Sequence, residues 1–300
     1  MTILILGGAD DEHAAHIHRE LSTRGHDAEF LDSRDFPQNM RIAYDPQRGG
    51  GSIRLPRGRA ISLAGVRSVY WRNYHGIGQI DLPHPEQAYI AANDARSLIE
   101  SLLINLPCRW VNGWAGFQLH QTKPAALARV AKLGVKIPAT TLTNDPKAVR
   151  AFADEHPRCI FKPVQGGAHT QRLTADHLSD ENLANLALAP VTVQEEIEGT
   201  NIRVFVAGEA THVCEVATGD VDFRDDPHAE ITACDLPEEI AEQSRRIAQA
   251  LDLLWTGIDF RRTPDGEYYF LEANPSPMFL GFEQQTGLPL TDALVRLLTE

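Results

Sequence analysis

Cysteine is scarce in this sequence of 300 residues, and the few that occur lie far apart. None belongs to a C-x-x-C pair, so the ligand spacing of a zinc motif is missing. Isolated cysteines favour free thiols in a reducing compartment. The sequence therefore argues against a protein held together by disulfides or zinc. The four cysteines are Cys108, Cys159, Cys214 and Cys234.

Long hydrophobic runs are also missing. No segment reaches the roughly 18 apolar residues that a membrane-spanning helix needs. The opening "MTILILGG" has a short apolar run with no basic stretch before it, which is typical of a buried first strand and not of a signal peptide. We therefore expect a cytoplasmic protein with no membrane partner.

Positive charge is the third deficit. The chain has 28 Lys and Arg against 41 Asp and Glu, a formal net charge of −13, and no basic run. Nucleic acids are bound by clustered Lys and Arg, so we expect no nucleic-acid partner. The content of 43% hydrophobic and 23% charged residues is ordinary for a globular protein with a substantial core, and the length suggests two or three subdomains.

The first third of the sequence predicts a parallel sheet. An apolar strand ending in glycines is followed by a helix from about Glu12 to Arg24 and by a second strand, and this β-α-β order is typical of α/β domains. A further strand, "VRSVYWRN", precedes a long helix that begins at Pro85 and is expected to turn Ile90 and Leu98 toward one side. We predict an N-terminal α/β domain over residues 1–115, with residues 46–59 as a surface excursion that could form a hairpin.

The rest of the chain divides into two regions that differ in the order of their predicted helices and strands. Residues 116–190 mix helices and strands, with Pro124 at a helix start, Thr122 as its cap and Gly134 at its stop. From Val191 onward the strands follow one another through short turns, which predicts an antiparallel sheet. We predict subdomains over 116–190 and 191–300.

A hairpin near the end of the chain carries two acids. The turn signal "PDG" separates "TGIDFRR" from "EYYFLEAN", and side chains alternate along a strand, so Glu272 and Asn274 share a face. A two-residue loop at Asp265–Gly266 would place Asp259 opposite Glu272. Opposed carboxylates repel unless a cation lies between them.

This set of oxygen donors leaves two interpretations open. Asp259, Glu272 and Asn274, with no Cys or His nearby, suit Mg²⁺ or Mn²⁺. Alternatively, these polar residues face solvent on a half-exposed sheet, and a three-residue loop would change the register.

Two lysines and a glycine pair could serve a phosphate. Lys162 stands on a predicted strand, and the backbone amides around Gly166 and Gly167 could cover a polyphosphate. Lys123 precedes them near a helix start. Each signal is weak alone, because a single lysine is usually solvated and paired glycines usually mark a turn.

The order of these features carries more information than any one of them. Lys123, then "FKPVQGG", "VQEEIEGTNIRVFVAGE", "DFR" and "GIDF…DGEYYFLEANP" resembles the ATP-grasp fold over residues 116–300. Within that superfamily the chain resembles the RimK-type ligases. The phrases "VDFR", "LPEEI", "TPDGEYYFLEANP" and "TGLPLTDALVRLL" are similar to the microviridin-type graspetide ligases, which close side-chain ester or amide rings in precursor peptides.

The resemblance implies a fold and a set of roles. The fold would be α/β and α+β, an ATP-grasp fold behind an N-terminal parallel α/β (pre-ATP-grasp) domain. ATP would lie between two subdomains with Mg²⁺ (or Mn²⁺) on the hairpin acids. By resemblance, the phosphates would meet Lys123 and Lys162 under the loop of Gly166 and Gly167; adenine and ribose would meet Gln194, Glu195, Glu196 and Ile197; the metal would meet Asp259, Glu272 and Asn274; and the transferred group would meet Arg203 and Arg224.

The resemblance also implies an activity: an ADP-forming ligase that activates a carboxylate as an acyl phosphate and joins it to an amine or hydroxyl of a peptide or small substrate. The alternatives are a RimK-like enzyme that adds free amino acids and an ATP-binding module without turnover. A homodimer would fit this group. The chain departs from the family pattern at Asn201, where many members have Asp, and at "SPMF" after Asn274.

Two further residue groups have ordinary explanations. Arg72 stands where related ligases have an Arg at a strand end, and a structural salt bridge is the favoured role. His13 and His16 are helical neighbours that could hold a metal, but we expect their helix to be exposed and disfavour a site there.

Overall fold

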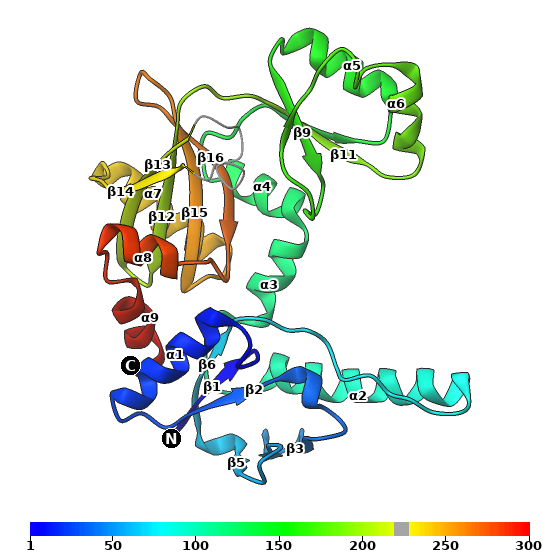
Figure 1. Ribbon diagram of the computed structural model, residues 1–300, viewed down its shortest axis with the longest axis vertical. Coiled ribbons are helices and arrows are strands. Elements are labelled where there is room, and N and C mark those ends of the chain that lie inside the picture. Colours follow the sequence, from blue (N-terminus) through cyan, green and yellow to red (C-terminus); the bar gives the residue numbers. More distant parts are fainter. Residues whose placement is uncertain (219–227) are drawn as a thin grey trace.

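The computed structural model describes residues 1–218 and 228–300, and these residues form three larger sheets and one small one. Figure 1 shows the N-terminal part below, a five-stranded sheet above it, and a third part at the top. The N-terminal sheet is parallel and the others are antiparallel. The predicted mixture of α/β and α+β architecture is confirmed.

The N-terminal sheet has the strand order β2-β1-β6-β7. Ile5 of β1 faces the helices α1 and α9, and Leu4 faces α2 on the other side of the sheet. Both faces are covered, which is why β1 is apolar throughout. The elements are β1 (Thr2–Leu6), α1 (Glu12–Thr23), β2 (Ala28–Leu31), β6 (Val66–Trp71), α2 (Pro85–Asn105) and β7 (Arg109–Val111).

Residues 41–62 form more than the predicted hairpin. They build a three-stranded antiparallel sheet of β3 (Arg41–Asp45), β4 (Gly50–Arg54) and β5 (Ala60–Ser62). It buries Ile53 and Ile61 against the α2 side of the parallel sheet.

Helix α2 is longer than the sheet that it covers. Its second half buries Ile99, Leu102 and Leu103, whereas Ile90 is 58% exposed on the half that extends away from the body in Figure 1. Ile90 therefore does not contact the core that Leu98 packs against, although the sequence predicted one side of the helix for both. Neither α2 nor any other helix within the described residues is long and apolar enough to cross a membrane.

The five-stranded sheet has the order β14-β13-β12-β15-β16. Helices α4 and α7 cover one face, where Val130 and Ile247 are fully buried against the strands. The elements are α4 (Lys123–Ala131), β12 (Thr200–Ala207), β13 (Ala210–Ala217), β14 (Glu230–Ala233), α7 (Glu238–Ala250), β15 (Trp255–Arg262) and β16 (Tyr268–Asn274).

The central sheet has the order β10-β9-β11-β8 and a small core of its own around Val149 and Val193. Strand β11 pairs with both β8 and β9, so this sheet extends to Glu195, beyond the boundary predicted at residue 190. The elements are β8 (Thr140–Thr143), α5 (Pro146–Glu155), β9 (Cys159–Pro163), β10 (Gln171–Arg172), α6 (Asp180–Ala184) and β11 (Val191–Glu195).

Helix α4 corrects the predicted division in the other direction, because it packs on the five-stranded sheet and not on the central one. It follows α3 (Trp114–Gln121) directly, and the two meet at Thr122. The Thr122 hydroxyl donates back to the carbonyls of Gln118 and Leu119, so it does not cap α4 as predicted. Gly134 ends this segment at φ +79°, as predicted.

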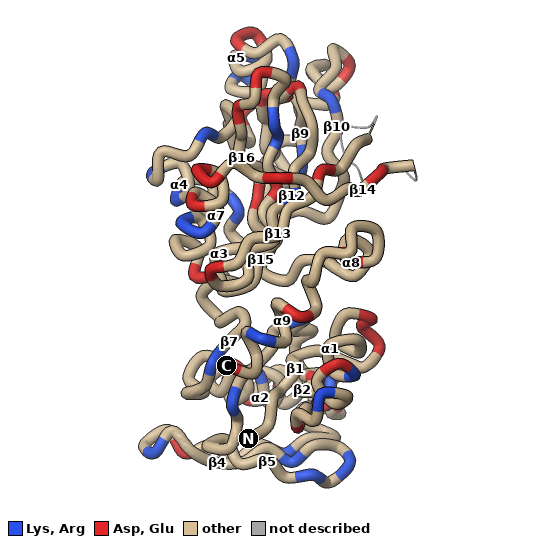
Figure 2. The backbone as a smooth tube through the Cα atoms, turned by 90° about the vertical axis from the view of Figure 1, so that its left-hand side faces the viewer, with Lys and Arg blue, Asp and Glu red and all other residues tan. Residues whose placement is uncertain are grey.

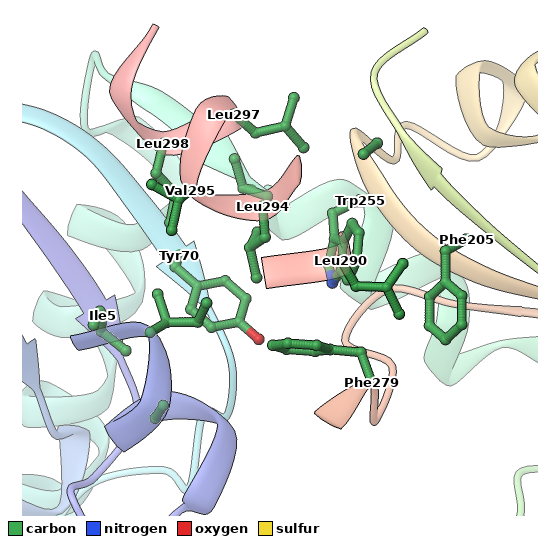
Figure 3. Packing of buried hydrophobic residues seen from close by; sticks show 14 of the residues in the cluster. Ile5, Tyr70, Phe205, Trp255, Phe279, Leu290, Leu294, Val295, Leu297 and Leu298 are labelled. Atoms are coloured by element: carbon green, nitrogen blue, oxygen red, sulfur yellow. The ribbon is translucent and has the colours of Figure 1, made fainter. Parts of the chain in front are cut away.

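One hydrophobic core joins the N-terminal sheet to the five-stranded sheet. Helices α8 (Leu280–Thr286) and α9 (Leu290–Thr299) lie between them, and Figure 2 shows α9 between β15 above and β7 below. Figure 3 shows Leu294 and Val295 of α9 reaching toward Tyr70 of β6, with Trp255 and Phe279 completing the contact. The two sheets are therefore held as one body.

Candidate functional site

The β15–β16 hairpin places Asp259 directly opposite Glu272, as predicted. The loop is not the predicted two-residue turn. Thr263 pairs with Glu267 across a loop of residues 264–266, in which Gly266 has φ +90°. A bulge between Asp259 and Phe260 then shifts the register back by one residue. The longer loop and the bulge each shift the strand pairing by one residue, in opposite directions, so Asp259 still lies opposite Glu272.

The bulge also decides which way Glu272 points. Tyr268 and Phe270 are buried in the core beneath the sheet, and strict alternation would send Glu272 into the same core. The extra residue, Leu271, changes the phase, so that Ala273 is the next residue in that core. Glu272 and Asn274 therefore lie on the opposite face.

Each acid is paired with a cation. Glu272 Oε2 lies 2.7 Å from Lys123 Nζ, and the Glu272 side chain is 39% exposed. Asp259 accepts two hydrogen bonds from Arg203, 2.6 Å from Nε and 2.8 Å from Nη2. Arg203 is buried, with its guanidinium 5.1 Å from the Phe282 ring centre. These two pairs bring four of the predicted site residues to one face of the hairpin.

The pKa shifts follow from these contacts. Burial acts to raise the pKa of Glu272, but the charge and hydrogen bond of Lys123, with the charge of Lys162, lower it overall. Burial acts to lower the pKa of Arg203, and Asp259 outweighs it, so that this pKa is raised. Both groups therefore stay ionised near neutral pH.

A cleft opens beside these pairs, between α4, the central sheet and β16. Apolar side chains make most of its wall, and Lys123, Lys162 and Glu272 lie along it. A largely apolar cleft with a few convergent charges is the usual form of a small-molecule site. The apolar and weakly polar lining consists of Pro124, Ala126, Leu127, Leu142, Val164, Thr192, Phe270, Leu271 and Ala273.

The resemblance placed adenine and ribose against a hinge of four consecutive residues, Gln194 to Ile197, and the structure divides these four between two recesses. Gln194 lines the cleft and is 2% exposed, with its Oε1 accepting from Lys162 Nζ at 3.3 Å. Glu195, Glu196 and Ile197 line a second recess. There Glu196 pairs with Arg172 at 3.0 Å. Alternation along β11 and the end of that strand explain the division.

The predicted glycine loop lies beside the lysine of α4. Gly166 has φ +127° and Gly167 has φ +99°, which disfavour any residue with a side chain. A Cβ added at Gly166 would lie 3.9 Å from Lys123 Nζ. Gln165 Nε2 donates to Gln121 Oε1 at 2.5 Å, which fixes this loop against the end of α3.

His120 is a lining residue that sequence reasoning missed. It lies on α3, three residues before Lys123, and burial followed by the Lys123 charge lowers its pKa, so it is neutral near pH 7. The sequence "HQTKP", which puts a histidine three residues before a predicted phosphate-binding lysine, could have indicated it.

The structure describes Asn201 but does not describe Arg224. Asn201 Oδ1 accepts from Arg261 Nη1 at 2.6 Å, an arginine that also donates to the Ile197 carbonyl. It therefore anchors the hinge indirectly. Arg224, predicted to face the transferred group, lies outside the described residues.

Arg72 and His13 are both buried in the structure. Arg72 is 8% exposed and pairs with Asp11, which agrees with the favoured structural role. His13 is 5% exposed and lies 4.9 Å from the Phe279 ring centre, so the expectation that this side of α1 is exposed was wrong. Among the described residues no group of three His, Cys, Asp and Glu side chains is arranged to hold a metal.

The hairpin donors nonetheless fit a divalent ion of the Mg²⁺ type. Asp259 and Glu272 are held opposite each other by the register, next to the positive charges of Arg203 and Lys123. Asn274 supplies a third oxygen, and Mg²⁺ takes few protein ligands with phosphate and water as the others. Asn274 Oδ1 accepts one hydrogen bond, from Ser276 N at 3.0 Å, and keeps a second acceptor position.

Curated relatives match part of the chain. A "Probable alpha-L-glutamate ligase 1" of Shewanella sp. (strain MR-4) is 27% identical over 187 residues, covering 58% of this chain and 61% of the relative. A protein of the same name from Shewanella sp. (strain ANA-3) is 31% identical over the same share. The chain thus matches about three fifths of the length of these relatives.

Two solved structures match almost throughout. The ATP-grasp ligase PsnB complexed with minimal precursor is 30% identical, with a TM-score of 0.84 over 99% of this chain and 97% of PsnB. The macrocyclase MdnC of Microcystis aeruginosa MRC, bound with precursor peptide MdnA, is 25% identical, with a TM-score of 0.86 over all of both chains. Residues 121–298 match the model of the RimK-like ATP-grasp domain, so the chain belongs to the RimK-like ATP-grasp family.

Proposed function

We propose that this protein is an ADP-forming ligase that joins a carboxylate to an amine or a hydroxyl of a peptide through an acyl phosphate. The observation that carries the proposal is the pairing of Lys123 with Glu272 and of Arg203 with Asp259 beside one apolar cleft. Cations for phosphate and oxygen donors for a metal lie side by side there. Phosphoryl transfer depends on such positioned charges.

The cleft residues would divide the nucleotide among them. The apolar wall around Leu142 and Val164 would take the base, with Gln194 at its inner end. Lys123 and Lys162 would hold the phosphates, and the backbone at Gly166 would cover them. Lys123 would then exchange Glu272 for phosphate oxygen as its partner.

Asp259, Glu272 and Asn274 would hold Mg²⁺ or Mn²⁺. A bound divalent ion would neutralise phosphate charge and orient the groups that react. The chain's own part is to keep these three oxygens on one face through the β16 bulge. Arg203, and by resemblance Arg224, would face the transferred phosphoryl group.

The reaction has two steps. A carboxylate oxygen of the substrate takes the γ-phosphoryl group, and the bond between that phosphorus and ADP breaks. The acceptor nitrogen or oxygen then attacks the acyl carbon, phosphate leaves with the carboxylate oxygen, and the acceptor proton is lost. Water would compete at the second step, and the loop around Gly166 would exclude it.

The substrate is best supported as a peptide that is closed into rings. PsnB and MdnC are described with precursor peptides, and this chain matches both over nearly all of their length. The match includes the N-terminal domain, which lies outside the RimK-like segment. We infer ester or amide formation between side chains of one peptide, with loss of one water for each ring.

Addition of free amino acids to a peptide is the second candidate. The Shewanella relatives, named probable glutamate ligases, favour it, although their match covers a smaller part of the chain. Incubation of the protein with ATP, Mg²⁺, glutamate and either MdnA or the minimal precursor of PsnB separates the two by mass spectrometry. Loss of water supports ring closure, and a gain of one residue supports addition. ADP without AMP is expected in both.

Glu272→Gln tests the site directly. It removes one metal ligand and the partner of Lys123, so we expect ATP turnover to fall about 100-fold or more while the fold is kept, because Glu272 is partly exposed. Glu267→Gln is the matched control, because Glu267 lies on the same hairpin and pairs with Lys136 outside the cleft. Asp259 is a poorer choice, since its loss would strand the buried charge of Arg203.

The readouts are ADP affinity by calorimetry with and without Mg²⁺, ADP release, and the circular dichroism melt. Equal activity of Glu272→Gln and Glu267→Gln would refute the metal assignment. ADP binding without product from any peptide or amino-acid mixture, in the wild-type protein, would instead favour an ATP-binding module without turnover.

A further inference from the structure

The segment that follows the predicted metal ligands is held from the N-terminal domain. Ser276 lies between Pro275 and Pro277, and its hydroxyl donates to the Arg72 carbonyl at 2.9 Å. The same hydroxyl accepts from Arg72 Nη1 at 3.0 Å, and Arg72 Nη1 also donates to the Ser276 carbonyl at 2.8 Å. Backbone and side chain of one serine are thus fixed to one buried arginine.

Arg72 is fixed in turn. Its Nε lies 3.0 Å from Asp11 Oδ1, and Asn73 Nδ2 donates to the other Asp11 oxygen at 2.8 Å. Asp11 caps α1 by accepting from Ala14 N. Each of these bonds has an ionised partner, so they are stronger than hydrogen bonds between neutral groups.

Two further contacts hold the same segment. Asn112, which is 1% exposed, donates from Nδ2 to the Pro275 carbonyl and to the Trp255 carbonyl, both at 2.6 Å. Gly257 lies opposite Asn274, and a Cβ added there would lie 2.9 Å from Pro277 Cβ. The lack of a side chain at Gly257 lets Pro277 pack directly on β15.

The contacts of Arg72 and Asn112 with residues 275–277 form a clamp around Ser276, and this Ser276 clamp reaches the predicted metal site through the backbone nitrogen of Ser276. Ser276 N donates to Asn274 Oδ1 at 3.0 Å. The terminal torsion of an asparagine is broad and close to two-fold, so a hydrogen bond decides whether its oxygen or its nitrogen faces a given direction. Only the oxygen can bind a cation. Fixing Ser276 therefore fixes the amide of Asn274.

We propose that Ser276 and Arg72 are positioning residues for the metal site, and that they act by holding the Asn274 amide oxygen in its ligand orientation. The inference rests on the proposed function, because it assumes that Asn274 is a metal ligand. The proposal gives the "SPMF" departure a role. Pro275 and Pro277 restrict the backbone on either side of Ser276, and Arg72 of the N-terminal domain hydrogen-bonds to that serine. Metal affinity would then depend on a contact across the domain boundary.

Ser276→Ala removes both hydroxyl bonds and leaves the backbone intact. Outer residues that orient metal ligands typically contribute about 10–100-fold in metal affinity, so we expect Mn²⁺ to bind at least about 10-fold more weakly in the presence of ADP. Ser276→Thr keeps a hydroxyl and should restore most of that loss. Free Mn²⁺ measured by electron paramagnetic resonance gives the affinity without any turnover.

Ser68→Ala is the matched control. Ser68 is fully buried on β6, and its hydroxyl donates to the Leu298 carbonyl at 2.7 Å, so its loss breaks a bond of the same type between the same two domains. We expect a comparable loss of thermal stability with unchanged Mn²⁺ affinity. Equal Mn²⁺ affinity in Ser276→Ala and wild type, or an equal weakening in Ser68→Ala, would overturn the positioning role. Absence of Mn²⁺ binding by the ADP-bound wild type would overturn the metal site itself.

Discussion

His13 shows how a single buried group can set the response of this protein to acid. Its Nδ1 has no hydrogen-bond partner in the part of the chain that the structure describes, its ring packs on Phe279, and burial followed by the charge of Arg72 lowers its pKa to about 4. Asp11 opposes that shift and His16 adds to it. A neutral imidazole is therefore built into the boundary between the N-terminal domain and the segment after Asn274.

The sign of the resulting pH dependence follows from proton binding. The unfolded chain binds a proton at His13 near pH 6.5, but the folded protein does so only near pH 4. Stability from this group is complete above the unfolded pKa and is lost as the pH falls toward the folded one. Between about pH 7 and about pH 5 the loss should be about 2 kcal/mol.

His13→Leu should remove that part of the acid sensitivity. We expect urea unfolding of the variant to show a drop in stability between these pH values that is smaller by about 2 kcal/mol than in wild type. His84→Gln, a change at an exposed histidine before α2, should leave the drop unchanged. An identical drop in His13→Leu and wild type would show that the imidazole is protonated in the folded state.

At the scale of elements, the sequence predicted helices and strands better than it predicted their fine register. The turn "PDG" and the alternation in "EYYFLEAN" led to the right partner for Asp259, but through a loop of the wrong length. The bulge at Leu271 depends on how β16 packs over the core, which local pattern does not contain. The interval of three from Phe270 to Ala273 is its only trace.

The cleft could not be assembled from spacing at all. Lys123, Lys162 and Glu272 are far apart in the chain, and only the resemblance to a family placed them together. The resemblance grouped Gln194 with Glu195 and Glu196, but Gln194 lines the cleft while Glu195 and Glu196 turn toward another recess. Which of these residues points inward depends on where β11 ends, at Glu195, and the local pattern does not fix that end.

Deletion of Leu271 tests the bulge. Without the extra residue, strict alternation from Phe270 would by itself put Glu272 opposite Asp259 and Ala273 in the core. We therefore expect Mg²⁺ still to strengthen ADP binding in this variant. Deletion of Leu82, in the exposed coil before α2, should leave that strengthening unchanged as well. Loss of the Mg²⁺ dependence in the Leu271 deletion alone would mean that Glu272 needs the bulge to keep its position.

At the scale of the whole molecule, the two-sheet core sets what can move. The N-terminal and five-stranded sheets share the contacts of α9, and Arg24 of α1 also pairs with Asp292 of α9 at 2.5 Å. The central sheet has a separate small core and connects to the rest through the segments on either side of β8 and β11. The wall of the cleft that β16 forms thus belongs to the same two-sheet body as the proposed metal ligands, and the other wall belongs to a separately packed unit.

Leu294→Ala tests this division. Leu294 is fully buried between the two sheets, so its truncation should cost about 2–5 kcal/mol. Because the core is shared, hydrogen exchange should speed up together in β1, β6 and β12, while β9 and β11 keep their protection. Val149→Ala, a truncation in the core of the central sheet, should give the reverse pattern. Faster exchange in only one of the two joined sheets after Leu294→Ala would mean that they unfold independently, and the Ser276 clamp would then span a boundary that opens.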